Sequence, residues 1–516
     1  MRPHKTLLSF ATSLTLALSG LPAAAQSTPA ATDATATTGE DQSTTNTAAD
    51  STRPRQASET RPDREVGSPP PPSETGSGFA FGSYGRVGVG LDGRGHEGYG
   101  VNVVSHGSRL EEPPYLELDF YYGGRVGSGR WRAVIAPAFG GDLFHYTGDF
   151  SSHFALRNGY VETEDLGAKG LRFWAGSRMY RGDDVYLFDY WPLDNLNTVG
   201  GGAGWKFGDN DIAVHVGLNR LNDPFQYQTQ GAPPHGLGPA ISAVVVDRPR
   251  LVATAKYTHY FLSQGGAPGL KLSAYTELHF LPEAVHQFQN QDQRVEQLPS
   301  ETGYVIGGQI GMWLRPFTFA NLFVRYATGI GVFGDLSLPQ TLSPPRAASN
   351  AREIVGALSL NYETRHIGVM AGAFVRSYRD PDPSALSVRD YVEGALAIRP
   401  QVYLTKWFHV AGEVSYQARS FAGFDPYLDR RLAPHVTRFS LMPIIAPLGP
   451  GTYSRPALYL VYTVSLLNDD ARDTLFDPTD VRYGGGFDPK TLRYSGSNTV
   501  QYIGVGAEWW FQSSYR

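Results

Sequence analysis

Aromatic and acidic side chains are interleaved within one short stretch, YLFDYWPLD at residues 186–194. Aromatic faces cover apolar surface and carboxylates accept hydrogen bonds from hydroxyl groups, and a sugar ring offers both kinds of surface. The stretch follows an amphipathic run, Leu171–Arg181, and a Gly-Asp-Asp turn signal at 182–184. We therefore expect a loop suited to handling sugars in water and entered from a strand. The hypothesis is that it lies inside a membrane β-barrel and narrows the pore.

The composition excludes several classes of site. The 516 residues include no cysteine, which rules out a disulfide framework, a thiol nucleophile and a Cys-ligated metal. A net charge of −5 gives no basic stripe for nucleic acid. The 13 histidines are dispersed without a pair at ligand spacing, so we expect no metal site, and nothing suggests a cofactor. A mean hydropathy of −0.28 is compatible with a membrane barrel, because only every second residue faces lipid.

Residues 1–25 are predicted to be a secretory signal peptide. Arg2 and Lys5 form the charged region, and Leu7–Leu18 is apolar but too short for a spanning helix. Ala23–Ala25 fits the cleavage site. The mature protein is therefore expected to leave the cytoplasm.

Residues 26–78 are a Thr/Ala/Ser/Pro-rich segment with almost no large apolar side chains. Such a segment cannot offset the entropy of folding by burial, so we predict a disordered periplasmic tether. A plain spacer is the simpler interpretation, and contact with peptidoglycan is the alternative.

From Phe79 to the end, runs of about ten residues alternate apolar and polar side chains and end at turn residues. Period-two alternation places one face in an apolar medium and the other in a polar one. The clearest runs are Phe79–Gly90, Tyr115–Tyr122, Val402–Tyr416 and Val500–Phe511.

A soluble β-sandwich would alternate in the same way. The signal peptide, the rings at strand ends and the final amphipathic strand closing on aromatics favour a transmembrane barrel instead. We therefore predict an all-β fold in which residues 79–516 form a transmembrane antiparallel β-barrel. Their length suits roughly 16–18 strands, a size that leaves a water-filled channel.

Several patches in this region resemble the maltoporin-type carbohydrate porins, outer-membrane sugar channels, in the order in which that family has them. Each patch alone is weak, and together they are fairly specific. They are SYGRVGVG (83–90), YLEL (115–118), FWAGSRMYRGDDVYLFDYW (173–191), LFVRYAT (322–328), IRP with KW (398–400 and 406–407), YSRPAL (453–458) and the terminal WW (509–510).

The resemblance implies a homotrimer of barrels with about eighteen strands in the bacterial outer membrane, each narrowed by an inward-folded loop. It implies passive, selective diffusion of maltose, maltodextrins or related sugars along a lane of aromatic rings, the slide, flanked by ionisable residues. Carried over by position, the slide would contain Tyr84, Tyr115, Trp407 and Trp510, with Phe323 as a fifth ring. The alternation separately places the first four on the polar, lumen face.

The resemblance also implies a polar track made of Arg86, Arg109, Glu117, Arg157, Asp184 and Asp189. Trp191 stands where the family has a Tyr that narrows the pore, and Gly182 stands where it has an Arg. Trp174 and Arg178 are expected to face the lumen. A ring supplied by a neighbouring subunit would correspond to Tyr146 or Phe150.

Three other functions compete with this interpretation. An enzyme could take a carboxylate pair for glycoside hydrolysis from among Glu117, Asp183, Asp184 and Asp189. Carboxylates in a wet pore stay ionised, however, so we expect no catalytic activity. A general diffusion porin would have the same barrel without sugar selectivity. A structural or adhesive barrel would have a closed lumen.

Overall fold

The computed structural model describes residues 78–98, 100–141, 152–232, 241–261, 268–287, 295–315, 317–339, 347–381, 389–425, 430–476, 487–488, 493–494 and 497–513. The predicted signal peptide and all but the last residue of the predicted tether lie outside these ranges. So do Tyr146 and Phe150, and their expected roles stay predictions.

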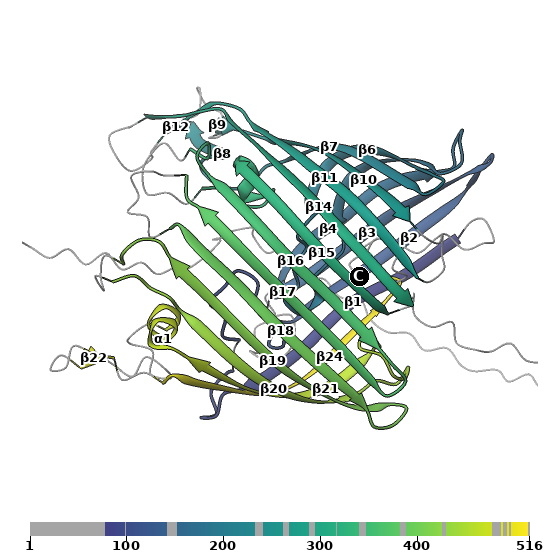
Figure 1. Ribbon diagram of the computed structural model, residues 1–516. Coiled ribbons are helices and arrows are strands. Elements are labelled where there is room, and N and C mark those ends of the chain that lie inside the picture. The colour runs from purple at the N-terminus through teal and green to yellow at the C-terminus, as the bar shows by residue number, and fades with distance from the viewer. Residues whose placement is uncertain are drawn as a thin grey trace, which may run out of the picture. The chain divides into compact units, whose positions relative to one another are not determined.

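Eighteen antiparallel strands form one closed sheet, which confirms the predicted barrel (Figure 1). Each strand pairs with the next of the set, and β1 pairs with β24 to close the ring. The strands are β1 (Gly78–Leu91), β2 (Tyr115–Val126), β3 (Gly129–Gly141), β4 (Ser152–Glu164), β5 (Leu171–Arg181), β6 (Asn195–Phe207), β7 (Asn210–Asn219), β10 (Arg250–Phe261), β11 (Gly269–Leu281), β14 (Glu301–Arg315), β15 (Thr318–Gly329), β16 (Arg352–Glu363), β17 (Ile367–Arg379), β18 (Tyr391–Tyr403), β19 (Phe408–Phe421), β20 (His435–Ile445), β21 (Ala457–Leu467) and β24 (Thr499–Phe511).

The barrel has the reverse of the residue distribution of a soluble protein. Leu460 and Val505 are more than half exposed on the outside, whereas Glu117 and Arg438 are almost fully buried inside. A face that exposes aliphatic side chains all around a closed sheet suits lipid, and a lumen that buries charge suits water and polar ligands. Alternation along each strand produces both faces, as the sequence predicted.

The connections differ between the two ends of the barrel. At one end they are long, as in 92–114, 182–194, 220–249 and 468–498. At the other end most are short, such as 127–128, 208–209 and 364–366, although 446–456 is longer. In outer-membrane barrels the short turns face the periplasm and the long loops face outward.

Small elements that the sequence did not predict lie in the long connections. They are the hairpin strands β8 (Tyr227–Ala232) with β9 (Ile241–Asp247), β12 (Ala284–Gln287) with β13 (Val295–Leu298), and β22 (Phe487–Asp488) with β23 (Arg493–Tyr494), the helix α1 (Asp469–Leu475) and the 3₁₀ turns η1 (Tyr186–Phe188) and η2 (Ile330–Phe333). In the described part of the chain, no helix has the length and apolar character needed to cross a bilayer.

Three of the connections that contribute buried residues surround the candidate site. Val101, Val103 and Val104 come from the connection 92–114, and residues 185–193 come from the connection between β5 and β6. The connection 446–456 enters from the short-connection end, where Thr452 is buried. The first two segments belong to the largest cluster of buried apolar side chains in the described residues.

Candidate functional site

The connection 182–194 folds into the barrel, as the sequence predicted. The backbone N–H of Gly182 donates to the carbonyl of Asp194 at 2.9 Å, which closes the base of the loop. A Cβ on Gly182 would lie 2.8 Å from the carbonyl oxygen of Leu193. Any larger residue at position 182 would open this base, so the glycine that departs from the family pattern has a structural reason.

Two ion pairs hold the ends of the inward loop to the barrel wall. The Asp183 carboxylate lies 2.6 Å from the Lys271 ammonium, and the Asp194 carboxylate lies 3.0 Å from that of Lys256. The loop tip reaches the opposite wall, where a Cβ on Gly372 of β17 would lie 2.7 Å from the Val185 side chain. The loop therefore spans the lumen with support on both sides.

Aromatic rings form a continuous row from the wall to the loop tip. Tyr84 lies 5.8 Å from Tyr115 and 6.5 Å from Trp510, centroid to centroid, and Tyr84 and Trp510 are register partners across the closing strand pair. The Tyr186 ring lies 6.2 Å from Trp510 and 5.2 Å from Tyr453 of the connection 446–456. Three of the five predicted slide rings thus adjoin one another, and two further rings extend the row.

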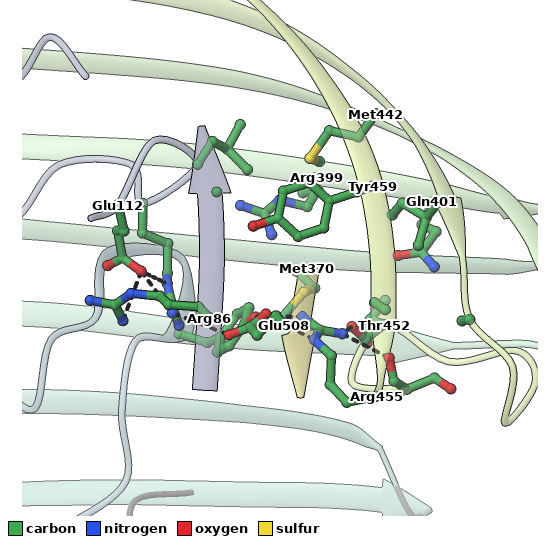
Figure 2. A pocket seen from close by; sticks show the side chains of 18 of the residues that line it. Arg86, Glu112, Met370, Arg399, Gln401, Met442, Thr452, Arg455, Tyr459 and Glu508 are labelled. Atoms are coloured by element: carbon green, nitrogen blue, oxygen red, sulfur yellow. Dashed lines mark hydrogen bonds and ion pairs between the residues drawn. The ribbon is translucent and has the colours of Figure 1, made fainter. Parts of the chain in front are cut away.

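A cavity of about 60 Å³ lies beside this row and is lined by Tyr186, by Glu508 and by part of the connection 446–456. Figure 2 shows Arg86 and Glu112 on one side of it and Gln401 and Thr452 on the other. Ligand pockets usually measure roughly 300–1,000 Å³, so this cavity suits a few water molecules rather than a sugar ring. In this conformation the cavity is too small to hold a sugar ring.

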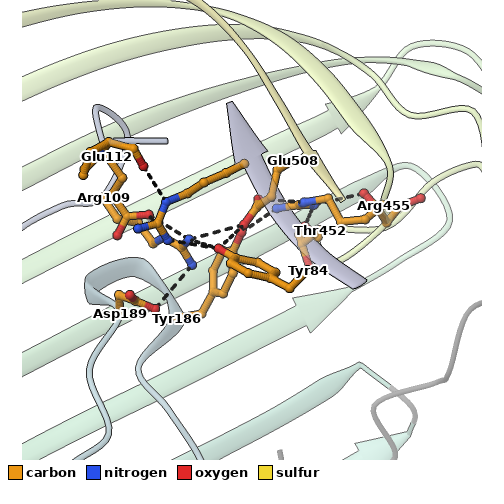
Figure 3. Close-up of polar contacts among 11 residues, drawn as sticks. Tyr84, Arg109, Glu112, Tyr186, Asp189, Thr452, Arg455 and Glu508 are labelled. Atoms are coloured by element: carbon orange, nitrogen blue, oxygen red, sulfur yellow. Dashed lines mark hydrogen bonds and ion pairs between the residues drawn. The ribbon is translucent and has the colours of Figure 1, made fainter. Parts of the chain in front are cut away.

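Glu508 of β24 is the centre of a buried polar network (Figure 3). Its carboxylate accepts from Arg455 Nε at 2.8 Å, from the Tyr186 hydroxyl at 2.9 Å, and from the Tyr84 hydroxyl and Arg109 Nη2 at 3.3 Å each. The Glu508 carboxylate therefore joins strands β1 and β24 to the connections 92–114, 182–194 and 446–456.

Arg109 continues this network towards a second carboxylate. Its Nε donates to Glu112 at 2.9 Å, and Arg86 pairs with the same carboxylate at 3.1 Å. Burial alone would lower the pKa of Arg109, but the neighbouring groups together, with Glu112 the strongest of them, outweigh burial and raise the pKa well above its usual value. Burial raises the pKa of Glu112, and the two arginines oppose that rise. Arginines and carboxylates alternate here as a paired polar track.

A further group of polar residues lies around Tyr115. Arg157 Nη1 donates to its hydroxyl at 2.8 Å, and that hydroxyl donates to Glu117 at 2.6 Å. Arg86 also lies 5.5 Å from the ring centroid, in cation–π geometry. Glu117 and Arg157 therefore fix the position of Tyr115, the first ring of the row, and they also line the lumen.

The opposite wall has its own ladder of charges. Glu393 of β18 stands opposite Arg376 of β17 and Arg419 of β19, and it pairs with both, at 3.3 and 2.5 Å. The Ser105 hydroxyl, from the connection 92–114, donates to the same carboxylate at 2.5 Å. This ladder attaches the connection 92–114 to the wall.

His106 joins the two inward loops. Its ring stacks on Tyr190 at 4.1 Å and meets the edge of Phe374 at 5.9 Å. Burial, and next the positive charge of Arg376, lower the pKa of His106 to about 4. The imidazole is therefore neutral at neutral pH.

The remaining predicted residues lie in different places. Phe323 is buried in the apolar cluster that also contains Tyr84, Tyr186 and Trp510. Trp191 is buried with Arg181 at 5.0 Å from its ring, and Asp184 is buried in the inward loop. Asp189 lies 3.9 Å from Arg109. Trp174 and Arg178 face the interior together, with the guanidinium 4.7 Å from the indole.

Trp407 differs from the other slide rings. It lies in the connection 404–407 before β19 begins, and it is 55% exposed. The alternation that placed it in the lumen applies only within a strand, so the structure does not bring it into the row.

Sequence reasoning did not assign a role to five residues of the site: Glu112, Tyr186, Tyr453, Arg455 and Glu508. Alternation had placed Glu508 on the face of Trp510, which was the signal that could have identified it. Tyr453 and Arg455 lie in a quoted patch, but nothing in the sequence shows that their connection turns inward. No group of three potential metal ligands occurs within the described ranges.

Comparison with known proteins gives a partial match in sequence and a distant one in fold. Maltoporins of Vibrio cholerae serotype O1 strains are 30% identical to this chain over 152 residues, which is 27% of this chain and 34% of theirs. The chain therefore matches only about a third of the length of these relatives.

Two solved structures extend over most of the chain at low similarity. The channel DcaP of Acinetobacter baumannii has a TM-score of 0.43 and 10% identity and covers 85% of this chain and 99% of its own. The anion-selective porin from Comamonas acidovorans has a TM-score of 0.39 and 12% identity, covering 84% and 100%.

The family match extends over nearly the whole barrel region. The model described as LamB porin matches residues 79–511, from the second residue of β1 to the last residue of β24. The chain therefore belongs to the LamB porin family and is an outer-membrane β-barrel.

Proposed function

We propose that the barrel conducts sugars, maltose and maltodextrins or related oligosaccharides, by passive, selective diffusion along the row of rings. The observation that carries the proposal is the row itself: Tyr115, Tyr84, Trp510, Tyr186 and Tyr453 follow one another at 5.2–6.5 Å. Each ring can cover the apolar face of a sugar.

The alternating charges beside the row support the same function. Arg86, Arg109 and Arg455 alternate with Glu112 and Glu508. All of them except Glu112 also form a hydrogen bond with a tyrosine hydroxyl of the row. A sugar hydroxyl can donate to the carboxylates and accept from the guanidiniums, so it can replace one partner at a time. Many weak, exchangeable sites in a row permit entry as well as release.

We also propose the homotrimer that is expected for the family. Contact of residues 26–78 with peptidoglycan, and a ring from a neighbouring subunit, stay predictions.

Blockage of ion current by sugars tests the proposal. The purified protein in a planar bilayer should be blocked saturably by maltohexaose, with maltose and sucrose run in parallel. Tyr115→Ala should weaken the block about 2- to 12-fold, because a ring contact contributes roughly 0.5–1.5 kcal/mol beyond burial.

Tyr122→Ala is the matched control, since Tyr122 lies on the same strand and is 56% exposed on the outer face. It should leave the block unchanged. A wild-type current that none of these sugars reduces would support the general diffusion porin instead.

A further inference from the structure

The connection 446–456 is unusual among the connections at the short-connection end. It is the longest of them, and it turns into the lumen instead of joining its strands directly. Gly449 and Gly451 have φ values of 111° and 149°, which favour glycine and mark a sharp change of direction. The segment thus has a short glycine-containing turn at its base, followed by residues that enter the lumen.

Thr452 attaches this connection to the wall beside it. Its backbone N–H and its hydroxyl both donate to Glu363 at 2.6 Å, and the hydroxyl oxygen also lies 2.9 Å from Asn361 Oδ1, so its one proton is shared between the two acceptors. The Tyr403 hydroxyl donates to the same carboxylate. Glu363 is the last residue of β16, so the anchor lies at the short-connection end.

Arg455 attaches the connection to the row of rings on the other side. Its guanidinium carbon lies 4.5 Å from the centroid of Trp510, and its Nη2 donates to the Tyr186 hydroxyl at 2.5 Å. With Glu508, these contacts leave Trp510 only 7% exposed. A guanidinium therefore occupies space at the ring where a sugar would stack.

The contacts that hold Arg455 are also contacts that a sugar can replace. Hydroxyl groups can donate to Glu508 and accept from Tyr186, and a sugar face can take the place of the guanidinium on Trp510. Since the adjoining cavity of about 60 Å³ is too small for a sugar ring, some lining segment must move. The connection 446–456 forms one side of that cavity.

We propose that the connection 446–456 is a gate at the short-connection end, in which Arg455 covers the Trp510 ring until the segment withdraws. The gate sets how fast a saccharide passes between the row of rings and the periplasmic mouth. This inference rests on the proposed sugar transport, and it assigns a rate-determining step to a segment that is not part of the inward loop 182–194.

The test compares variants by the kinetics of maltohexaose block in a planar bilayer, with sugar added at the short-connection side of channels inserted in one orientation. Arg455→Ala should raise the sugar-free conductance. It should also raise the sugar association rate from that side about tenfold, which corresponds to the loss of one charge-assisted hydrogen bond, about 1.4 kcal/mol.

Arg365→Ala is the matched control, because Arg365 is exposed in the connection 364–366 at the same end of the barrel. Arg365→Ala removes the same charge and should change neither the sugar-free conductance nor the sugar association rate. Thr452→Val is the second variant: it keeps Arg455, removes the hydroxyl that contacts Glu363 and Asn361, and should also speed association.

The possible results separate the inference from the proposed function. If no sugar blocks the wild-type channel, sugar transport itself fails. If the wild type is blocked but Arg455→Ala and Thr452→Val both behave like Arg365→Ala, the gate is refuted. A weaker block by sugar with unchanged conductance in Arg455→Ala would also refute it, because Arg455 would then be a simple binding residue.

Discussion

The carboxylate of Glu508 is predicted to be the most sensitive single group of the lumen. It accepts four hydrogen bonds, two of them from the guanidiniums of Arg109 and Arg455, and its side chain is only 8% exposed. The change Glu508→Gln keeps the shape of the side chain but removes the negative charge. Two buried arginines then lose a shared counter-charge, and one of the new amide hydrogens faces a donor.

The structure sets the size of this effect. At 2.8 Å and an effective dielectric constant of about 20, the attraction between Arg455 and Glu508 is roughly 6 kcal/mol before desolvation is counted. Removing one partner of a buried ion pair typically costs about 3–5 kcal/mol of stability. We expect Glu508→Gln to lower the free energy of unfolding within that range, because Arg109 keeps Glu112 as a partner whereas Arg455 keeps only neutral acceptors.

The assay is equilibrium unfolding by denaturant in lipid vesicles, with the midpoint and slope measured for each variant. Glu164→Gln is the matched control, because Glu164 pairs with Arg130 at 2.9 Å but is 41% exposed, and an exposed pair contributes about 0–1 kcal/mol. If Glu508→Gln cost no more than Glu164→Gln, the network around Glu508 would not hold the lumen together and the reasoning would be refuted.

Two further predictions concern the inward loops. The pKa of His106 is lowered from about 6.5 to about 4 in the docked loop, so a released loop binds a proton more readily than the docked one. Docking of the loop should therefore weaken as the pH falls from about 6.5 to 4, by up to about 3 kcal/mol. Open-channel current noise should rise over that range, and His106→Asn should remove the dependence. Gly372→Ala should push Val185 away, change the conductance and lower the free energy of unfolding by about 1–3 kcal/mol through overpacking. Gly356→Ala is the control, because its Cβ would meet nothing within 4 Å, and it should change neither the conductance nor the stability. Equal conductance in the two variants would contradict the docking of the loop tip at Gly372.

The strands and their two faces could be predicted from the sequence because alternation is a local property. Tyr84 and Trp510 were placed in the lumen by the parity of their positions, and both are buried inside the closed sheet. Trp407 shows where this reasoning stops, since parity has no meaning once the chain has left the strand. The register that sets Tyr84 opposite Trp510 joins the first strand to the last, and no local pattern specifies it.

The paths of the connections could be predicted less well. The inward loop was expected from its residue types together with the family resemblance. The inward course of 446–456 depends on contacts between Thr452 and Glu363 and between Arg455 and Glu508, which are distant in sequence. Such contacts have no periodic signal, so Arg455 could be recognised as a site residue only in the folded barrel.

The pairing of β1 with β24 has a consequence for the order of assembly. The Tyr84 hydroxyl and its acceptor Glu508 are separated by 424 positions, and the two strands that bear them meet only when the sheet closes. Contacts of such long range form late, because the chain between them must first be organised. A partly folded sheet has both edges exposed and lacks the junction of Tyr84 and Trp510, so this part of the aromatic row is absent from incompletely closed barrels. Sugar binding at this junction would therefore report that biogenesis is complete.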